Sequence, residues 1–112
     1  MKKIEAYVRP NRLENVKQAL GENNVQGLSV TEVVGGGKGA RRRIMYRGTE
    51  AHADLQPQAK LEIVVQDHLV ENIIDVIRGA ARTGESGDGK IFVYAVEEAI
   101  RIRTGERGEE AI

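Results

Sequence analysis

The chain has 112 residues and a mass of 12.3 kDa, a size that fits one domain with a modest hydrophobic core. Lysine plus arginine equal aspartate plus glutamate at 17 each, so the protein as a whole has no electrostatic attraction for nucleic acid or for an anionic membrane. The absence of cysteine excludes disulfides, thiolate metal sites and thiol catalysis. The sequence contains neither a signal-peptide core nor a membrane-spanning apolar run, which predicts a cytoplasmic protein.

The first segment of the chain recurs in its second half. KIEAYVRPNRLENVKQAL, residues 3–20, aligns with KLEIVVQDHLVENIIDVI, residues 60–77, at a constant offset of 57 residues. Each copy begins with apolar residues at alternate positions, which predicts a strand at about 4–8 and another at about 61–65. The two halves are therefore expected to be structural copies of one strand-helix unit.

Each copy continues into a predicted helix. The apolar residues of the first helix are Leu13, Val16 and Leu20, and those of the second form a wider stripe of Leu69, Val70, Ile73, Ile74, Ile77 and Ala81. Glycine is common at helix ends, so Gly21 and Gly84 are expected to mark the two C-termini. Asn11 is a candidate N-cap of the first helix.

Another strand is predicted after each helix, at 27–34 and at 90–96, which gives the order β-α-β-β-α-β. This is the ferredoxin-like α+β fold, in which both helices cover one face of a four-stranded antiparallel sheet. The last strand is apolar on both faces, which favours a homo-oligomer that covers the open face. The alternative is a monomer that tolerates an exposed Phe92 and Tyr94.

A glycine-rich segment of about twenty residues lies within VVGGGKGARRRIMYRGTEAHADLQPQAK, residues 33–60, and is predicted to be a long loop. A Walker A loop needs a hydroxyl residue after Gly37 and Lys38, where this chain has Gly39. The pattern Gly35 to Ala40 fits a relaxed dinucleotide motif, but no helix is predicted after it. The glycines therefore indicate either flexibility or close approach of the backbone to a ligand.

The same loop carries a local basic patch within a neutral protein. Its net charge of about +3 comes from Lys38, Arg41, Arg42, Arg43 and Arg47 against Glu50 and Asp54.

Two further segments indicate an anion site. TGESGDGK, residues 83–90, can form a nest of backbone N–H groups with Lys90 as a point charge, although an ordinary glycine-rich connection remains the alternative. In IRIRTGERGEE, residues 100–110, Arg101 and Arg103 alternate with isoleucines, and an extended chain would place both guanidinium groups on one side. Together these cations favour a polyphosphate such as a nucleotide.

The motifs KIEA, TEVVGGG, YRGTE, KLEIVV and AARTGESGDGKIFVYAVEEAIRIRTGE closely resemble those of PII signal-transduction proteins, the nitrogen regulators, over essentially the whole chain. The resemblance implies one domain over residues 1–112 and a homotrimer that binds ATP or ADP in clefts between subunits. It also implies a partner-binding T-loop at about 36–57, a B-loop at about 82–90 and a C-terminal loop at about 97–112.

The resemblance also implies the site residues. The nucleotide-binding set comprises Gly27, Leu28, Ser29, Gly35, Gly37, Lys38, Glu62, Val64, Gly87, Asp88, Gly89, Lys90, Arg101 and Arg103. Ser29 stands where a threonine is usual, and its hydroxyl can serve the same purpose. The T-loop residues expected to meet a partner are Arg41, Arg42, Arg43, Tyr46, Arg47 and Thr49. No catalytic or metal-ligating residue is implied.

Three further positions depart from the family pattern. Gly39 replaces the glutamine that ligates magnesium between ATP and 2-oxoglutarate, and Gln58 replaces the lysine that pairs with the 2-oxoglutarate carboxylate. Magnesium with ATP remains possible, but 2-oxoglutarate sensing is expected to be weakened or lost. Ala51 replaces the modifiable tyrosine, which excludes nucleotidylylation there, while modification of Thr49 stays open.

The expected function is therefore non-catalytic regulation of nitrogen metabolism through an ammonium transporter, a nitrogen-assimilation enzyme or a carbon-uptake protein, with only indirect membrane contact. A regulator of carbon or bicarbonate uptake is the alternative. An RNA-binding module is disfavoured because GKIFVYAV falls on the fourth strand and the chain has only four aromatic residues. A weak ATPase is disfavoured because His52 and His68 have no evident triad partners.

Overall fold

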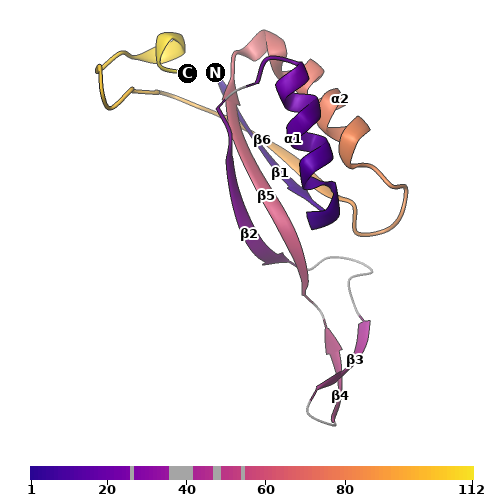
Figure 1. Cartoon of the computed structure of the whole chain (residues 1–112). Coiled ribbons are helices and arrows are strands. Elements are labelled where there is room, and N and C mark those ends of the chain that lie inside the picture. Colours follow the sequence, from indigo (N-terminus) through magenta and orange to yellow (C-terminus); the bar gives the residue numbers. More distant parts are fainter. Residues whose placement is uncertain (26, 36–41, 47–48, 54) are drawn as a thin grey trace.

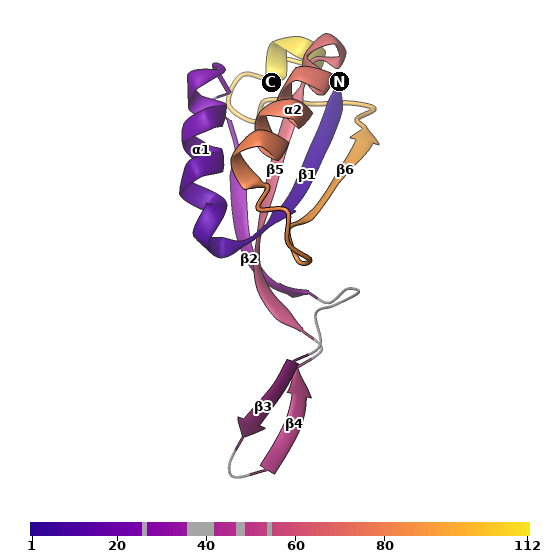
Figure 2. The same cartoon turned by 90° about the vertical axis from the view of Figure 1, so that its right-hand side faces the viewer.

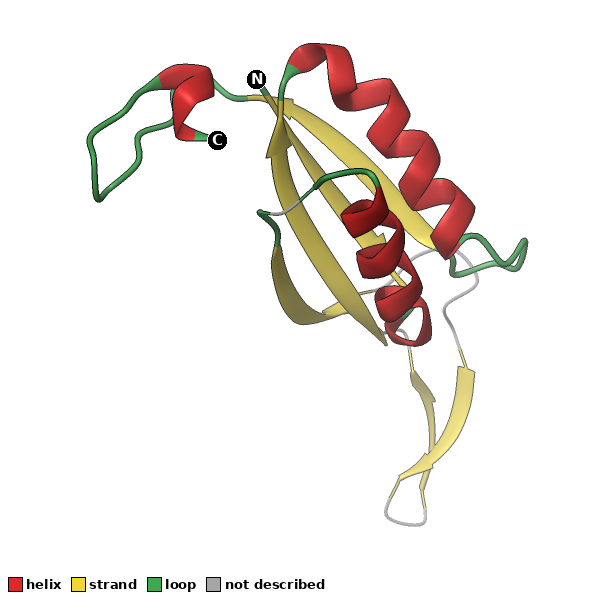
Figure 3. Ribbon diagram, turned by 45° about the horizontal axis from the view of Figure 1, so that its top comes forward, coloured by secondary structure: helices red, strands yellow, loops and turns green. Residues whose placement is uncertain are grey.

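The computed structural model describes residues 1–25, 27–35, 42–46, 49–53 and 55–112 (Figure 1). Its main sheet has four antiparallel strands in the order β2-β5-β1-β6. The strands and the two helices of this unit are β1 (Lys2–Val8), α1 (Leu13–Glu22), β2 (Ser29–Gly35), β5 (Gln56–Val65), α2 (Val70–Ala81) and β6 (Gly89–Ala95). Both helices cover the same face of the sheet (Figures 2 and 3), which confirms the predicted ferredoxin-like α+β fold.

The hydrophobic core lies between this face and the helices. Alternate apolar residues of β1 and β5 are buried, and Ile4 and Leu61 are almost completely so. Val16 and Leu20 of α1 and their repeat equivalents in α2, which are Ile73 and Ile77, are fully buried in the same cluster. The internal repeat therefore identified the core because equivalent positions pack from both halves.

The opposite face of the sheet carries charges that the repeat arranges in two reciprocal pairs. Glu5 of β1 stands directly across from Glu62 of β5, so the lysine two residues before each glutamate reaches the other strand diagonally. The Nζ of Lys3 lies 3.3 Å from Glu62 Oε2, and the Nζ of Lys60 lies 3.4 Å from Glu5 Oε1. The repeated Lys-x-Glu motif thus produces two equivalent cross-strand ion pairs.

Glu5 is almost fully buried, with 6% of its surface exposed, and the Tyr94 hydroxyl donates a 2.8 Å hydrogen bond to its Oε2. This hydrogen bond and the Lys60 ammonium lower the pKa of Glu5. The Glu5 and Glu62 carboxylates raise the pKa of Lys60. The Lys3 ammonium also lies 4.9 Å from the centre of the Tyr94 ring, so the predicted open face is a polar network with aromatic residues at its edge.

The predicted long loop contains a two-stranded sheet that the sequence did not reveal. It consists of β3 (Arg42–Tyr46) and β4 (Thr49–Ala53), and Figure 1 shows it beyond the ends of β2 and β5. The segment between Gly35 and Gln56 thus has about the predicted length, but it contains a strand pair that the prediction of a loop did not include. The basic run and the scattered alanines give neither strand a clear alternation of apolar and polar residues.

The helix ends also differ from the prediction. Asn11 does not cap α1, because Pro10 begins a short 3₁₀ helix, η1 (Pro10–Arg12), which leads directly into it. Gly21 lies inside the last turn, and Asn24 provides the left-handed residue (φ +64°) beyond the helix end. α2 ends at Ala81, with η2 (Asp67–Leu69) before it, so Gly84 belongs to the following loop.

In the described residues, no helix combines the length and the apolar character needed to span a membrane.

Candidate functional site

The loop between α2 and β6 is organised around the carboxylate of Asp88. Its Oδ2 accepts hydrogen bonds from the backbone N–H groups of Thr83 (2.9 Å) and Gly84 (2.8 Å), and its Oδ1 accepts one from the Thr83 hydroxyl. The Thr83 hydroxyl, together with these N–H groups, holds the pKa of Asp88 well below its usual range. The first two N–H groups of the predicted nest thus bind the protein's own carboxylate, which corrects the expectation that they face a ligand.

Arg9 joins this loop to the end of β1. Its Nε donates a 3.0 Å hydrogen bond to Asp88 Oδ1, and its Nη2 donates a 2.7 Å hydrogen bond to the carbonyl oxygen of Ser86. The side chains of Arg9 and Asp88 are both partly buried. This contact was not predicted from the sequence, because a single arginine before a proline matches no binding motif.

The loop approaches β1 so closely that Gly89 cannot be replaced without strain. Its φ of +107° lies in the left-handed region, and a Cβ there would overlap the carbonyl oxygen of Tyr7 and lie 2.7 Å from the carbonyl carbon. Gly87, with φ +100°, is in a similar position, since an added Cβ would lie 3.3 Å from Arg9 Nη2. Both predicted glycines therefore have a backbone reason to be glycine.

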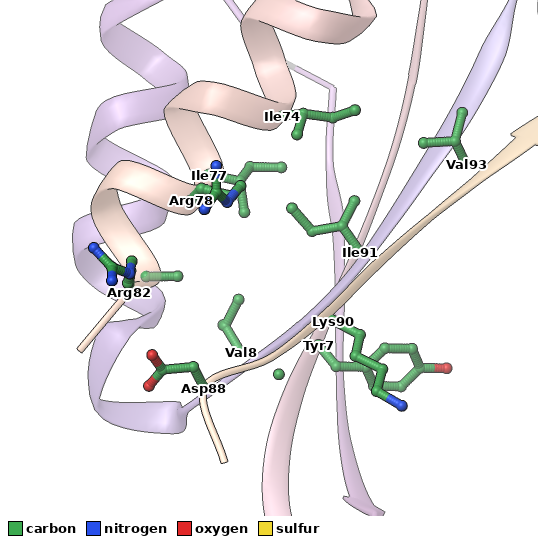
Figure 4. Close-up of a pocket in the computed structure, with 12 residues that line it drawn as sticks. Tyr7, Val8, Ile74, Ile77, Arg78, Arg82, Asp88, Lys90, Ile91 and Val93 are labelled. Atoms are coloured by element: carbon green, nitrogen blue, oxygen red, sulfur yellow. The ribbon is translucent and has the colours of Figure 1, made fainter. Parts of the chain in front are cut away.

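Lys90 leaves this loop on the face of the sheet opposite the helices. It is the direct cross-strand neighbour of Tyr7, and Figure 4 shows the two side chains extending side by side. The Tyr7 ring meets Phe92 edge-on, with 6.0 Å between the ring centres. Lys90 is exposed, and its side chain makes no ion pair or hydrogen bond within the described ranges. It is therefore a cation that remains available to a ligand.

A pocket of about 370 Å³ lies on the other side of β6, between this strand and α2 (Figure 4). Its wall is apolar, with Ile77 and Ile91 among the lining residues. Arg78, Arg82 and Asp88 add charged groups around it. Of the predicted phosphate-binding residues, Asp88, Gly89 and Lys90 are among those that line this pocket.

Three other predicted residues gather on the open face of the sheet. Ser29 of β2 stands directly across from Glu62 of β5. Val64 lies two residues further along β5 and therefore on the same face. Each carboxylate oxygen of Glu62 has a lysine within 3.4 Å, Lys3 on one side and Lys60 on the other. The carboxylate is therefore held in place before any ligand arrives.

The remaining predicted residues are spread over the chain. Gly27 and Leu28 precede β2, and Gly35 ends it. A Cβ on Gly35 would collide with the side chain of Gln58, which lies on the neighbouring strand. Arg42, Arg43, Tyr46 and Thr49 fall on β3 and β4. Gly37, Lys38, Arg41 and Arg47 lie outside the described residues.

The C-terminal arginines do not lie on an extended chain, so that prediction was wrong. A turn covers residues 102–104, stabilised by a 2.7 Å hydrogen bond from the Gly105 N–H to the Arg101 carbonyl oxygen, and Gly105 has φ +74°. Arg101 donates to the Glu106 carboxylate (3.1 Å) and to the Glu110 carbonyl oxygen (3.2 Å). Arg103 is exposed without a partner in the described part of the chain.

The two halves of the predicted phosphate site are far apart within one chain. The loop of residues 83–88 precedes β6 and the C-terminal segment follows it, so they lie at opposite ends of the sheet (Figures 1 and 2). The seven residues of β6 span about 23 Å. Arg101 and Arg103 therefore cannot meet Lys90 of the same chain in this arrangement.

A family model described as "Nitrogen regulatory protein P-II" matches residues 1–106. The chain belongs to the PII family. Its full length aligns with the full length of the nitrogen regulatory protein P-II of Rhodospirillum rubrum at 55% identity and with that of Haemophilus influenzae at 50%. The crystal structure of Arabidopsis thaliana PII bound to citrate matches with a TM-score of 0.81 and 42% identity, covering 99% of this chain and 91% of the plant chain. The resemblance inferred from the motifs is thereby confirmed.

Membership places the protein among regulatory proteins of nitrogen metabolism. The PII fold thus brings some of the predicted site together and separates the rest. Gly87, Asp88, Gly89 and Lys90 form one cluster with Tyr7, and Ser29, Glu62 and Val64 form another on the open face. No group of three or more His, Cys, Asp or Glu residues that could hold a metal ion occurs in the ranges that the structure covers.

Proposed function

We propose that this PII protein binds ATP or ADP in clefts between the subunits of a homotrimer and controls partner proteins through its T-loop, without catalysis and in the cytoplasm. The observation that supports this proposal is the separation of Lys90 from Arg101 and Arg103 at the two ends of β6. A ligand that needs all three cations requires the C-terminal segment of a second copy. The exposure of Phe92 (44%) and Tyr94 (45%) on β6 also favours a neighbouring subunit there.

The cations and glycines of the site suit a nucleotide polyphosphate. Lys90 is unpaired among the described residues, and Gly87 and Gly89 allow the backbone to approach a ligand closely. Each charge-assisted hydrogen bond contributes about 1.5 to 3 kcal/mol, and micromolar affinity requires roughly 8 kcal/mol. Arg101 is already bound to Glu106, so Lys90 and Arg103 are expected to contribute more than Arg101.

Sensing of 2-oxoglutarate is expected to be weakened or lost. Gly39 has no side chain that could ligate magnesium, and Gln58 has an uncharged amide in place of a lysine ammonium. Magnesium would then be carried by the phosphates of ATP. The arginines at 41–43 are available for another anion or for an acidic partner surface. Ala51 has no hydroxyl, so tyrosine nucleotidylylation is excluded at that position.

ATP and ADP would control the T-loop through its base, at Gly37 and Lys38, by favouring different loop conformations and hence different partners. The partner would be an ammonium transporter, a nitrogen-assimilation enzyme or a carbon-uptake protein. A regulator of carbon or bicarbonate uptake is the second candidate, favoured by the loss of 2-oxoglutarate ligands at Gly39 and Gln58.

Calorimetric titration of the protein with ATP, ADP and AMP, each with and without magnesium and 2-oxoglutarate, tests the proposal. We expect micromolar ATP or ADP binding, and at least about tenfold weaker binding by Lys90→Ala, because one charged hydrogen bond is lost. Lys17→Ala removes the same charge from an exposed pair with Glu14 on α1 and should bind normally. Absence of nucleotide binding would contradict the proposed nucleotide site. Strong enhancement of ATP binding by 2-oxoglutarate would contradict the proposed weakening or loss of 2-oxoglutarate sensing.

Light scattering tests the assembly. The expected mass is three times that of the 12.3 kDa chain, and a monomer would contradict the inter-subunit cleft. Incubation with ATP should release no phosphate above the level of Lys90→Ala, since the protein is proposed to be non-catalytic.

A further inference from the structure

We infer that Arg9 is a positioning residue for polyphosphate binding, which holds the loop of residues 83–88 against β1 before the ligand arrives. This inference rests on the proposed nucleotide-binding function. Arg9 itself would not touch the nucleotide. Its effect would pass through Asp88 and Ser86 to Gly87, Gly89 and Lys90.

The backbone of Arg9 is fixed from both sides, which makes it a rigid anchor. Val8 before it is the last residue of β1 and is buried in the core. Pro10 after it begins η1, and the Arg12 N–H donates a 2.9 Å hydrogen bond to the Arg9 carbonyl oxygen. The guanidinium is therefore presented to the loop from a point that the sheet and η1 define together.

The guanidinium connects two separate points of the loop at once. Nε binds the Asp88 carboxylate at 3.0 Å and Nη2 binds the Ser86 carbonyl oxygen at 2.7 Å. Asp88 in turn accepts from the N–H groups of Thr83 and Gly84, so Arg9 is linked to the beginning of the loop as well as its end. A lysine has a single nitrogen and cannot reproduce this fork.

The loop needs such a clamp because of its composition. Gly84, Gly87 and Gly89 all have positive φ values, and glycine has many competing conformations when it is not restrained. Without Arg9, a polyphosphate would have to order the loop while it binds, and the cost of that ordering lowers affinity. With Arg9 in place, the backbone at Gly87 and Gly89 is already set beside Lys90.

The experiment compares ATP affinity by calorimetry in full-length wild type, Arg9→Gln, Arg9→Lys, Asp88→Asn and the Arg9→Gln/Asp88→Asn double variant. We expect about tenfold weaker binding by Arg9→Gln, and Arg9→Lys should keep less than half of the wild-type affinity. The ATP affinity of the double variant should lie within twofold of that of the weaker-binding single variant, because both changes break the same network. The control is Arg12→Gln, three residues away on η1, which should bind within twofold of wild type.

Hydrogen exchange separates positioning from a general loss of fold. In Arg9→Gln the Thr83 and Gly84 amides should exchange faster, while the Ala6 and Ile63 amides at the centre of the sheet should keep their protection. Unchanged exchange in the loop, wild-type ATP affinity in Arg9→Gln, full recovery in Arg9→Lys, or additive effects in the double variant would each overturn the inference. If wild type itself binds no ATP, the proposed nucleotide-binding function is contradicted. Faster loop exchange in Arg9→Gln would then show that Arg9 holds the loop without a role in phosphate binding, which also overturns the inference.

Discussion

Replacement of Gly89 by alanine tests how closely the glycine-rich loop is fitted to β1. Gly89 begins β6 and pairs with Val8 of β1, beside the carbonyl of Tyr7. A Cβ at this position would overlap that carbonyl oxygen and lie 2.7 Å from the carbonyl carbon. Since both obstructing atoms belong to the backbone, no side-chain rotation relieves the overlap, and the two strands must separate locally.

The expected cost follows from two effects. An alanine in the left-handed region, here at φ +107°, costs about 1 to 2 kcal/mol. Forcing an extra carbon into a packed site costs about 1 to 3 kcal/mol more. The free energy of unfolding should therefore fall by roughly 2 to 5 kcal/mol, a large part of the 5 to 15 kcal/mol typical of a domain, so the variant is expected to fold with a clearly reduced midpoint.

Urea unfolding followed by circular dichroism measures the loss, at one fixed protomer concentration because dissociation of an oligomer would shift the midpoint. Gly105→Ala is the matched control, since Gly105 also has a positive φ (+74°) but an added Cβ meets nothing within 4 Å. It should lose only the backbone component of about 1 to 2 kcal/mol. Equal losses in the two variants would refute the argument that the Tyr7 carbonyl excludes a side chain.

Three further predictions concern the polar networks. Tyr94→Phe removes the hydrogen bond to the buried Glu5 and should lower the thermal midpoint by about 4 to 8 °C, whereas an unchanged midpoint would mean that Lys60 alone satisfies the carboxylate. The pKa of Asp88 is lowered in the folded state, so its carboxylate stabilises the fold above the unfolded pKa of about 4, and this stabilisation is lost as the pH falls below that value. The stability of Asp88→Asn should therefore decrease less steeply with falling pH than that of wild type. Parallel curves for the two proteins would contradict this. Lys3→Met should weaken ATP binding several-fold by releasing Glu62, which calorimetry against the Lys17→Ala control can detect.

The core could be predicted from sequence because it depends on periodicity. The repeat placed Val16 and Leu20 opposite Ile73 and Ile77, and all four are buried in one cluster. The four-stranded antiparallel sheet and its covered face followed from the ferredoxin-like connection rules. These features are set by many residues at once, so no single deviation could obscure them.

The parts that sequence reasoning missed depend on single contacts. The Arg9 fork onto Asp88 and Ser86 joins residues about eighty positions apart, and no local pattern encodes it. The turn after Arg101 was hidden because alternating isoleucines and arginines also fit a strand, and Gly105 decides between the two. The reciprocal Lys-x-Glu pairs were visible in the repeat, but only the antiparallel register of β1 and β5 makes them ion pairs.

The candidate site lies beside a position at which the two copies of the repeat differ. Up to the end of their first strands the copies are equivalent, and their lysines and glutamates even form symmetric pairs across the sheet. At the next position the first copy has Arg9 and the second has Gln66, which cannot provide a charged fork. Arg9 has the Asp88 carboxylate of the glycine-rich loop within reach. The repeat thus supplies a rigid scaffold, and the arginine at this position allows the loop of residues 83–88 to be held for a ligand. Amide hydrogen exchange of this loop in Arg9→Gln is therefore the sharpest test of the site.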